Sequence, residues 1–89
     1  FPSLITISSI YPNPFNPTTQ IYLQADRETY VTAKIIDISG RVVETIHPIQ
    51  LSKGENILTW DASNNPSGIY FLNILSDGYS VSSKLMLIK

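Results

Sequence analysis

Cysteine is absent from this 89-residue chain, which excludes disulfides and thiolate metal sites. Charge is scarce too, because charged residues make up 15% of the sequence against a usual ~25%. The formal net charge of −1 provides no basic field for nucleic acid or for anionic lipid. No apolar run approaches the ~18 residues of a membrane-spanning helix. We therefore expect neither a nucleic-acid partner nor insertion into a membrane.

Catalytic motifs are also missing. The sequence has one histidine, His47, and it has neither a Gly-x-Ser-x-Gly elbow nor a glycine-rich phosphate loop. A hydrolytic triad would need this histidine beside a nucleophile and an orienting carboxylate. It stands instead before Pro48, where we expect a strand to end. We interpret His47 as an exposed residue at that strand end, and we expect no enzyme and no cofactor.

The composition that remains suits a small β-domain. Hydrophobic residues make up 43% of the chain, and Ser, Thr and Asn supply most of the polarity. The length predicts one domain, residues 1–89, with a modest core. Within it, residues 1–10 are either a first strand or the tail of a linker. The chain opens at Phe1 without a signal peptide or an initiator Met, so we expect it to be a piece of a longer protein.

The stretch from Tyr11 to Thr19, Y-P-N-P-F-N-P-T-T, carries three prolines in six positions. Each proline fixes φ at about −65° and removes a backbone donor, and each residue before a proline is kept out of the α region. Helix is therefore excluded here, as is the middle of a sheet. We predict a stiff, extended crossover between two strands. Asn13 and Asn16 should bond to nearby backbone, and Phe15 should anchor the crossover in the core.

Alternation of apolar and polar residues predicts about seven short strands: residues 3–10, 19–25, 30–38, 41–46, 56–61, 69–76 and 79–89. The pattern slips at Ile36, which indicates a bulge. Pro48 should end the fourth strand, residues 26–29, three of them charged, should form a solvated hairpin tip, and Asp77-Gly78 is a two-residue hairpin signal. The pattern predicts an all-β fold in which two sheets form a sandwich.

The residues expected in the core of that sandwich lie mostly on one face of their strands, with Trp60 near the centre. They are Ile21, Leu23, Val31, Ile35, Leu58, Trp60, Tyr70, Leu72, Ile74, Leu85 and Leu87. Lys84 and Lys89 bracket the apolar end of the last strand, where lysines protect an edge from aggregation.

Two aspartates, Asp37 and Asp61, stand close to strand ends and could be imagined as an acid–base pair. Each is followed by turn-forming residues, so we predict that they cap backbone N–H groups instead. The oxygens of residues 61–65 could also hold Ca²⁺, although the spacing lacks the glycine and distal glutamate of a calcium loop. That calcium site stays an open alternative.

Five segments, taken in order, resemble the C-terminal sorting domain (type A) of type IX secretion in Gram-negative bacteria. This family is related to the immunoglobulin-like domain of the flagellar hook-capping protein. The crossover resembles the family's opening signature, and residues 31–43 its central strand–turn–strand block. The other matches are G-x-x-x-x-x-W-D at residues 54–61, S-G-x-Y at 67–70 and K-x-x-L-x-K at 84–89. One departure is Ile36, which stands where the family often has tyrosine.

The resemblance implies an immunoglobulin-like antiparallel β-sandwich that follows the N-terminal cargo domains of a secreted protein. An outer-membrane translocon recognises such a domain after transit through the periplasm, and a sortase removes it when the cargo is attached to the cell surface. The domain is then a substrate of this machinery and not a catalyst. The residues carried over for partner recognition are Pro12, Asn13, Pro14, Phe15, Asn16, Pro17, Gly40, Arg41, Gly68, Tyr70, Lys84 and Lys89.

Two other functions stay open on the sequence alone. The chain could be a carbohydrate-binding or adhesive module appended to a secreted enzyme, which requires a flat row of exposed Tyr or Trp on one sheet. Tyr22, Tyr30 and Tyr79 are the candidates for that row. It could also be a structural spacer of immunoglobulin type.

Overall fold

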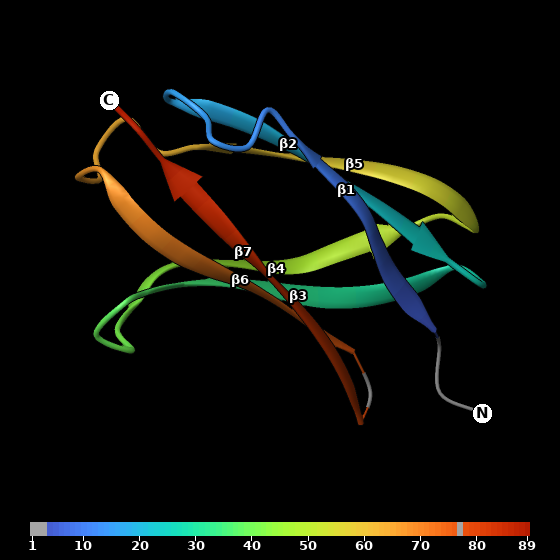
Figure 1. Ribbon diagram of the computed structural model, residues 1–89. Helices are drawn as coiled ribbons and strands as arrows, with labels where there is room; N and C mark the ends of the chain where they lie inside the picture. Colours follow the sequence, from blue (N-terminus) through green and yellow to red (C-terminus); the bar gives the residue numbers. More distant parts are fainter. Residues whose placement is uncertain (1–3, 77) are drawn as a thin grey trace.

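The computed structural model describes residues 4–76 and 78–89, apart from the side chains of His47 and Pro48. Its strands are β1 (Ile5–Tyr11), β2 (Thr18–Ala25), β3 (Thr29–Asp37), β4 (Val42–Leu51), β5 (Gly54–Asp61), β6 (Gly68–Ser76) and β7 (Tyr79–Leu87) (Figure 1). The described residues include no helix that could cross a membrane. The predicted all-β fold is confirmed.

The strands form two sheets that pack face to face (Figure 1). One sheet has the order β1-β2-β5 and the other the order β4-β3-β6-β7, and every paired neighbour is antiparallel. A sandwich of three plus four antiparallel strands is the immunoglobulin-like architecture, as expected.

The core lies between the inward faces of these sheets. In β2, buried Thr19, Ile21, Leu23 and Ala25 alternate with more exposed residues, because successive side chains of a strand point to opposite faces. Every residue predicted for the core is buried except Leu58, which is only partly buried at the margin, on an edge strand. Core members that the pattern did not predict are Ile5, Ala25, Ala33, Leu51 and Ala62.

Phe15 enters this core from the crossover and is 2% exposed. Its ring centroid lies 5.6 Å from that of Trp60 at an interplanar angle of 54°. Trp60 in turn meets Tyr70 edge-on, with centroids 5.5 Å apart. Such tilted and edge-to-face pairs are favoured by the ring quadrupole. The predicted anchor is therefore confirmed, and it joins the crossover to β5 and β6.

The fourth strand is longer than predicted. Pro48 does not end it, because β4 continues to Leu51 and pairs with β3 up to Thr29. The reason is that β4 is an edge strand, where a missing N–H need not disrupt a ladder, and its register shifts between Val31 and Ala33. A second shift, between Ile35 and Ile36, confirms the predicted bulge. The prediction of an exposed His47 side chain lies outside the described residues.

The turns largely follow the sequence signals. The pair Ser76↔Tyr79 closes a two-residue hairpin between β6 and β7, with Gly78 at φ +65°; Asp77 lies outside the described residues. Residues 26–28 are exposed, as predicted, but the segment is not a hairpin tip, because β2 and β3 belong to different sheets. It crosses from one sheet to the other, and Asp26 accepts a hydrogen bond from the Leu4 N–H at 3.0 Å and so clamps the start of β1. The last strand ends at Leu87, two residues before the predicted end. It lies at a sheet edge, as expected.

We predict that Phe15→Ala lowers the free energy of unfolding by about 3–5 kcal/mol, because it removes a fully buried ring and leaves a cavity. Urea denaturation followed by Trp60 fluorescence measures the change. The matched control is Phe71→Ala, since Phe71 is 41% exposed on the outer face of β6 and its loss should reduce stability by no more than about 1.5 kcal/mol. Equal effects of the two variants would contradict the anchoring role of Phe15.

Candidate functional site

The strand register brings four parts of the chain to one end of the sandwich. Thr18 pairs with Asp61, Asp37 with Tyr70, and Gly68 with Leu87. The crossover, the β3–β4 turn, the β5–β6 loop and the end of β7 therefore lie together (Figure 1). We call this the crossover end. All five segments that resemble the sorting domain reach it.

The crossover is bonded along the edge of β7. The Asn13 amide donates to the carbonyl of Lys84 at 3.1 Å, and its Oδ1 accepts from the Met86 N–H at 2.9 Å. The Phe15 N–H donates to the carbonyl of Met86, and the Phe15 carbonyl accepts from the Ile88 N–H, both at 2.9 Å. The Asn13 side chain and the Phe15 backbone thus take the place of a neighbouring strand.

Two further bonds hold the crossover at its ends. The buried Thr19 hydroxyl donates to the Pro12 carbonyl at 2.6 Å, and the Ala62 N–H donates to the Pro17 carbonyl at 2.9 Å. The three prolyl peptide bonds after Tyr11, Asn13 and Asn16 are cis.

The local hydrogen bonds expected for the asparagines are not found. Asn13 bonds to β7, far along the chain, because the crossover folds back against that edge. No side-chain hydrogen bond of Asn16 occurs in the described part of the chain. The crossover also bends through residues 12–14 and 16–17, so it is extended only locally at Phe15.

Tyr70 fixes the β5–β6 loop. Its hydroxyl donates to the Pro66 carbonyl at 2.6 Å, four residues upstream and near the start of β6, which is the tyrosine corner of immunoglobulin-like sandwiches. Burial raises the pKa of the Tyr70 phenol, and the Asp37 charge raises it further. The neighbouring Trp60 donates its indole N–H to Glu44 on β4 at 2.8 Å, which ties the two sheets together.

Asp37 organises the β3–β4 turn. Its Oδ1 accepts from the N–H and hydroxyl of Ser39 at 3.0 and 2.6 Å and from the N–H of Arg41 at 3.0 Å. Its Oδ2 lies 3.5 Å from Nε of Arg41. The Ser39 hydroxyl is the main reason that the pKa of Asp37 is lowered. Gly40 occupies the turn with φ +92°, a conformation that favours glycine.

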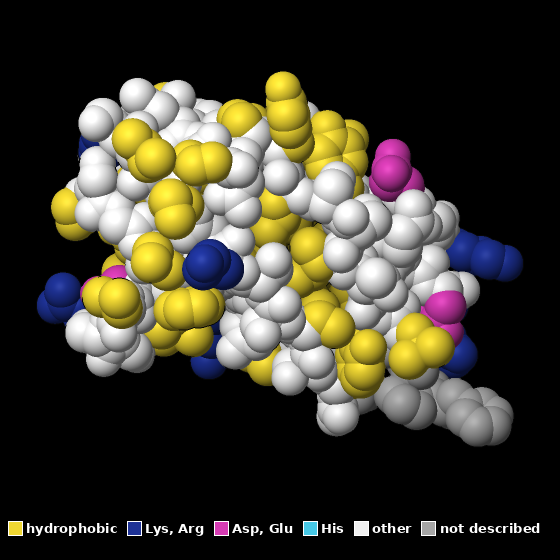
Figure 2. All heavy atoms as spheres, viewed as in Figure 1, with side chains coloured by type: hydrophobic (Ala, Val, Ile, Leu, Met, Phe, Trp, Pro, Cys, Tyr) yellow, Lys and Arg dark blue, Asp and Glu magenta, His cyan; other side chains and the backbone are white. Residues whose placement is uncertain are grey.

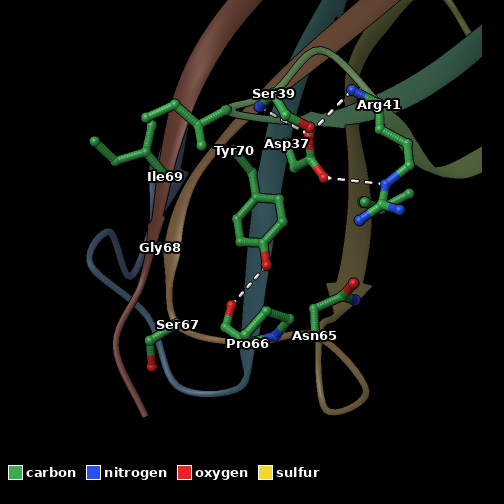
Figure 3. Close-up of a pocket in the computed structure, with 11 residues that line it drawn as sticks. Asp37, Ser39, Arg41, Asn65, Pro66, Ser67, Gly68, Ile69 and Tyr70 are labelled. Carbon is green, nitrogen blue, oxygen red and sulfur yellow. Dashed lines mark hydrogen bonds and ion pairs between the residues drawn. The ribbon is translucent and has the colours of Figure 1, made fainter.

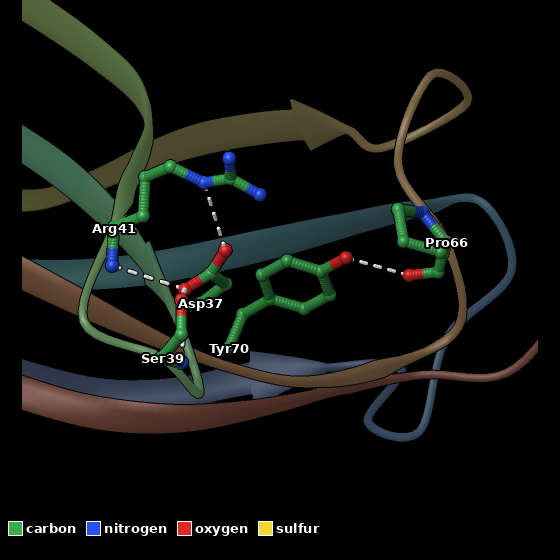
Figure 4. Close-up of polar contacts among 5 residues, drawn as sticks. All are labelled: Asp37, Ser39, Arg41, Pro66 and Tyr70. Atoms are coloured by element: carbon green, nitrogen blue, oxygen red, sulfur yellow. Dashed lines mark hydrogen bonds and ion pairs between the residues drawn. The ribbon is translucent and has the colours of Figure 1, made fainter.

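A cleft of about 340 Å³ separates this turn from the β5–β6 loop (Figure 3). Arg41 and Asp37 stand on one side of it, Asn65 and Pro66 on the other, and the Tyr70 ring lies between them (Figures 3 and 4). The Arg41 side chain is 80% exposed, and only its Nε faces Asp37. Its terminal nitrogens are therefore available to a partner.

Lys89, which follows β7, is hydrogen-bonded to the β5–β6 loop at the crossover end. The Lys89 N–H donates to the Ser67 hydroxyl at 2.9 Å, and its ammonium donates to the Ser63 carbonyl at 2.7 Å. Asp61 accepts from the N–H and the hydroxyl of Ser63, and the hydroxyl contact is the main reason that the pKa of Asp61 is lowered. Both Asp37 and Asp61 thus cap turns, as predicted.

The structure bears on two other arrangements, a cluster of metal ligands and a row of tyrosines, while the calcium alternative at residues 61–65 stays a prediction. No group of three or more His, Cys, Asp and Glu side chains that could hold a metal occurs in the part of the chain that the structure describes. Tyr22 belongs to the three-stranded sheet, whereas Tyr30 and Tyr79 belong to the other sheet. These three tyrosines therefore form no single row of the kind that a carbohydrate platform requires.

The residues expected to recognise a partner divide by burial. Phe15 and Tyr70 are buried, so they support the crossover end from within. Pro17 is half-buried, and Lys84 is exposed on the outer face of β7. The remaining members are exposed at the crossover end: Pro12, Asn13, Pro14, Asn16, Gly40, Arg41, Gly68 and Lys89. Two residues that hold this end together were not predicted: Thr19, which bonds to Pro12, and Glu44, which bonds to Trp60. The signal for Thr19 was its place on the inward face of β2, whereas no local pattern indicates the contact between Glu44 and Trp60.

We predict that Asp37→Asn destabilises the fold in a pH-dependent way. The folded-state pKa of Asp37 is lowered from an ordinary value of about 4, so its charge stabilises the fold above that pH. This contribution is lost as the pH falls through the folded pKa. Urea midpoints of the parent and the variant should differ most at pH 7, and the difference should begin to shrink as the pH falls below about 4. A difference that stays constant with pH would contradict the role of the charge.

Comparison with known proteins gives one family and one fold. Residues 9–89 match the family described as secretion system C-terminal sorting domain. No curated protein matches the chain. Among solved structures, the chain is similar to the crystal structure of dimeric latent PorU from Porphyromonas gingivalis, with 18% identity and a TM-score of 0.73. The match covers 99% of this chain and 10% of that one, and at this identity it supports the fold alone.

The expected family is therefore confirmed. Its members are sorting signals and are typically non-catalytic. Membership of this family implies interaction with the secretion machinery and secretion to the cell surface or the extracellular space. This chain belongs to the secretion system C-terminal sorting domains, the signals that direct cargo into type IX secretion.

Proposed function

We propose that the type IX machinery recognises this domain at its crossover end. The observation that carries the proposal is the strand register, which brings all five sorting-domain segments to that end. Most of the residues expected to meet a partner are exposed there. Because the crossover is bonded to β7, β2 and the β5–β6 loop, little conformational entropy is lost when a partner binds it.

Three cations are the direct contacts in this proposal. Arg41 offers its terminal nitrogens over the cleft, and Arg fits carboxylates in a bidentate manner. Lys89 presents an ammonium beside the β5–β6 loop, and Lys84 projects from the outer face of β7. Phe15 and Tyr70 keep these groups in place from the core.

The partners in this proposal are the outer-membrane translocon and a sortase, which meet the domain after periplasmic transit. Cargo joined ahead of Phe1 would enter near Leu4, because Ile5 pairs with Ala25 at the far end of β2 from Thr18. The sandwich is 39 Å in its longest extent. Cargo and translocon therefore do not compete for one surface, and the sortase acts on the linking segment with residues 1–89 as one unit.

Export of a reporter tests the sorting function directly. Residues 1–89 are fused behind a reporter that carries an inner-membrane export signal, in a bacterium with type IX secretion. We expect surface or extracellular reporter only when the domain is present. If the reporter alone, or the reporter joined to an unrelated immunoglobulin-like domain, arrives equally well, the domain is a spacer and the proposal is wrong.

Charge variants in the same fusion test the recognition surface. Arg41→Gln and Lys89→Gln each remove a charged donor, and a hydrogen bond to a charged group is worth about 1.5–3 kcal/mol. Recognition should therefore weaken roughly tenfold or more while the urea midpoint stays near that of the parent. The control is Lys53→Gln, because Lys53 is exposed in the β4–β5 turn at the opposite end and its loss should leave export unchanged. If all three variants are exported equally well, the crossover end is not the contact surface and this part of the proposal is wrong.

A further inference from the structure

One side of the sandwich is open between two edge strands. β1 and β7 are the outer strands of their sheets, and they lie side by side (Figure 1). Hydrophobic side chains are visible in the strip between them (Figure 2). Both strands carry apolar residues that pack against the core and are only partly buried: Ile7 and Ile10 on β1, and Tyr79 and Val81 on β7.

The edge of β7 is occupied over half of its length. The crossover bonds to the outward groups of Lys84, Met86 and Ile88. Since outward groups alternate along an edge strand, those of Ser80 and Ser82 point the same way. No hydrogen bond reaches them in the described part of the chain. In the described structure, the backbone N–H and C=O groups of Ser80 and Ser82 therefore have no hydrogen-bond partner beside the apolar strip.

The β7 edge lacks the usual protection of a sheet edge. β7 carries only Lys84 and pairs with β6 without a register shift. β1 carries no charge, but its register shifts between Ile7 and Ser9. The opposite side is protected, because β4 has Glu44, Pro48 and two register shifts and β5 has Glu55. Charges, prolines and bulges are the features that block strand addition. The contrast marks the β7 edge as the one that accepts a strand.

The crossover shows how such a strand binds. Its Phe15 backbone makes two hydrogen bonds to β7 in a parallel bridge, while its ring is buried between the sheets. An added segment at Ser80 and Ser82 would continue this arrangement along the same edge, with apolar side chains directed into the strip.

We propose that the β7 edge at Ser80–Ser82 is a strand-addition site for a protein partner of the secretion machinery, which deepens the proposed sorting function and rests on it. The occupant is an extended segment with apolar side chains at every second position and few charges. Backbone hydrogen bonds supply affinity, and the strip between β1 and β7 selects the apolar residues. A carboxylate that follows the segment would lie near Lys84.

Proline variants at outward positions test the site in the reporter fusion. Ser82→Pro removes the outward N–H and leaves the inward bonds to β6, and proline is tolerated at such edge positions. We expect export to fall at least tenfold for Ser82→Pro, and to stay normal for Ser82→Ala, which keeps the backbone donor. Ser80→Pro serves as the second blocking variant if the first fails to fold, as judged by its urea midpoint.

Amide exchange in the wild-type domain tests the edge without any variant. The Ser80 and Ser82 amides should exchange quickly, whereas those of Val81 and Ser83, which face β6, should be protected. Protected Ser80 and Ser82 amides would overturn the inference. Normal export of a folded proline variant would also overturn the inference about the β7 edge. The proposed sorting function would then still hold. Failure of the wild-type fusion would instead refute the sorting function, and this inference with it.

Discussion

The structure depends on one buried ring. Phe15 lies among Trp60 and the inner faces of both sheets, and its own N–H and C=O are bonded to the end of β7. A proline-rich segment supplies few donors to a sheet, so it can be held only by side chains and by its remaining backbone groups. Phe15 and Asn13 provide both. With the ring in place, the crossover is part of the sandwich and presents a fixed surface.

That surface is built from loops and positioned by strands. The Asp37 carboxylate shapes the β3–β4 turn, the Tyr70 hydroxyl holds the β5–β6 loop, and Lys89 closes the gap between that loop and β7. Each polar group is used to hold backbone, and neither aspartate shares its carboxylate with a second acid. These contacts shape the surface that we propose for recognition. Such a surface agrees with the role of the family as a sorting signal for secretion.

Much of the fold follows from local patterns. The period of two in β2 and β3 places their inward residues correctly, and a lone aromatic among prolines identifies Phe15 as an anchor. Local patterns do not predict contacts with residues that are distant in the sequence. The Asn13 amide reaches β7 instead of its own turn. β4 passes through Pro48 because its outer edge faces no strand, and the cleft beside Arg41 joins segments that only the register brings together.

The central claim is that the crossover is rigid because Phe15 holds it. Backbone ¹⁵N relaxation of the isolated domain measures this directly at Asn13, Phe15 and Asn16. The structure predicts order parameters of about 0.85, equal to those of β2 and β6. Values below about 0.6 at these three residues, with rigid strands around them, would show a mobile crossover and would contradict the account.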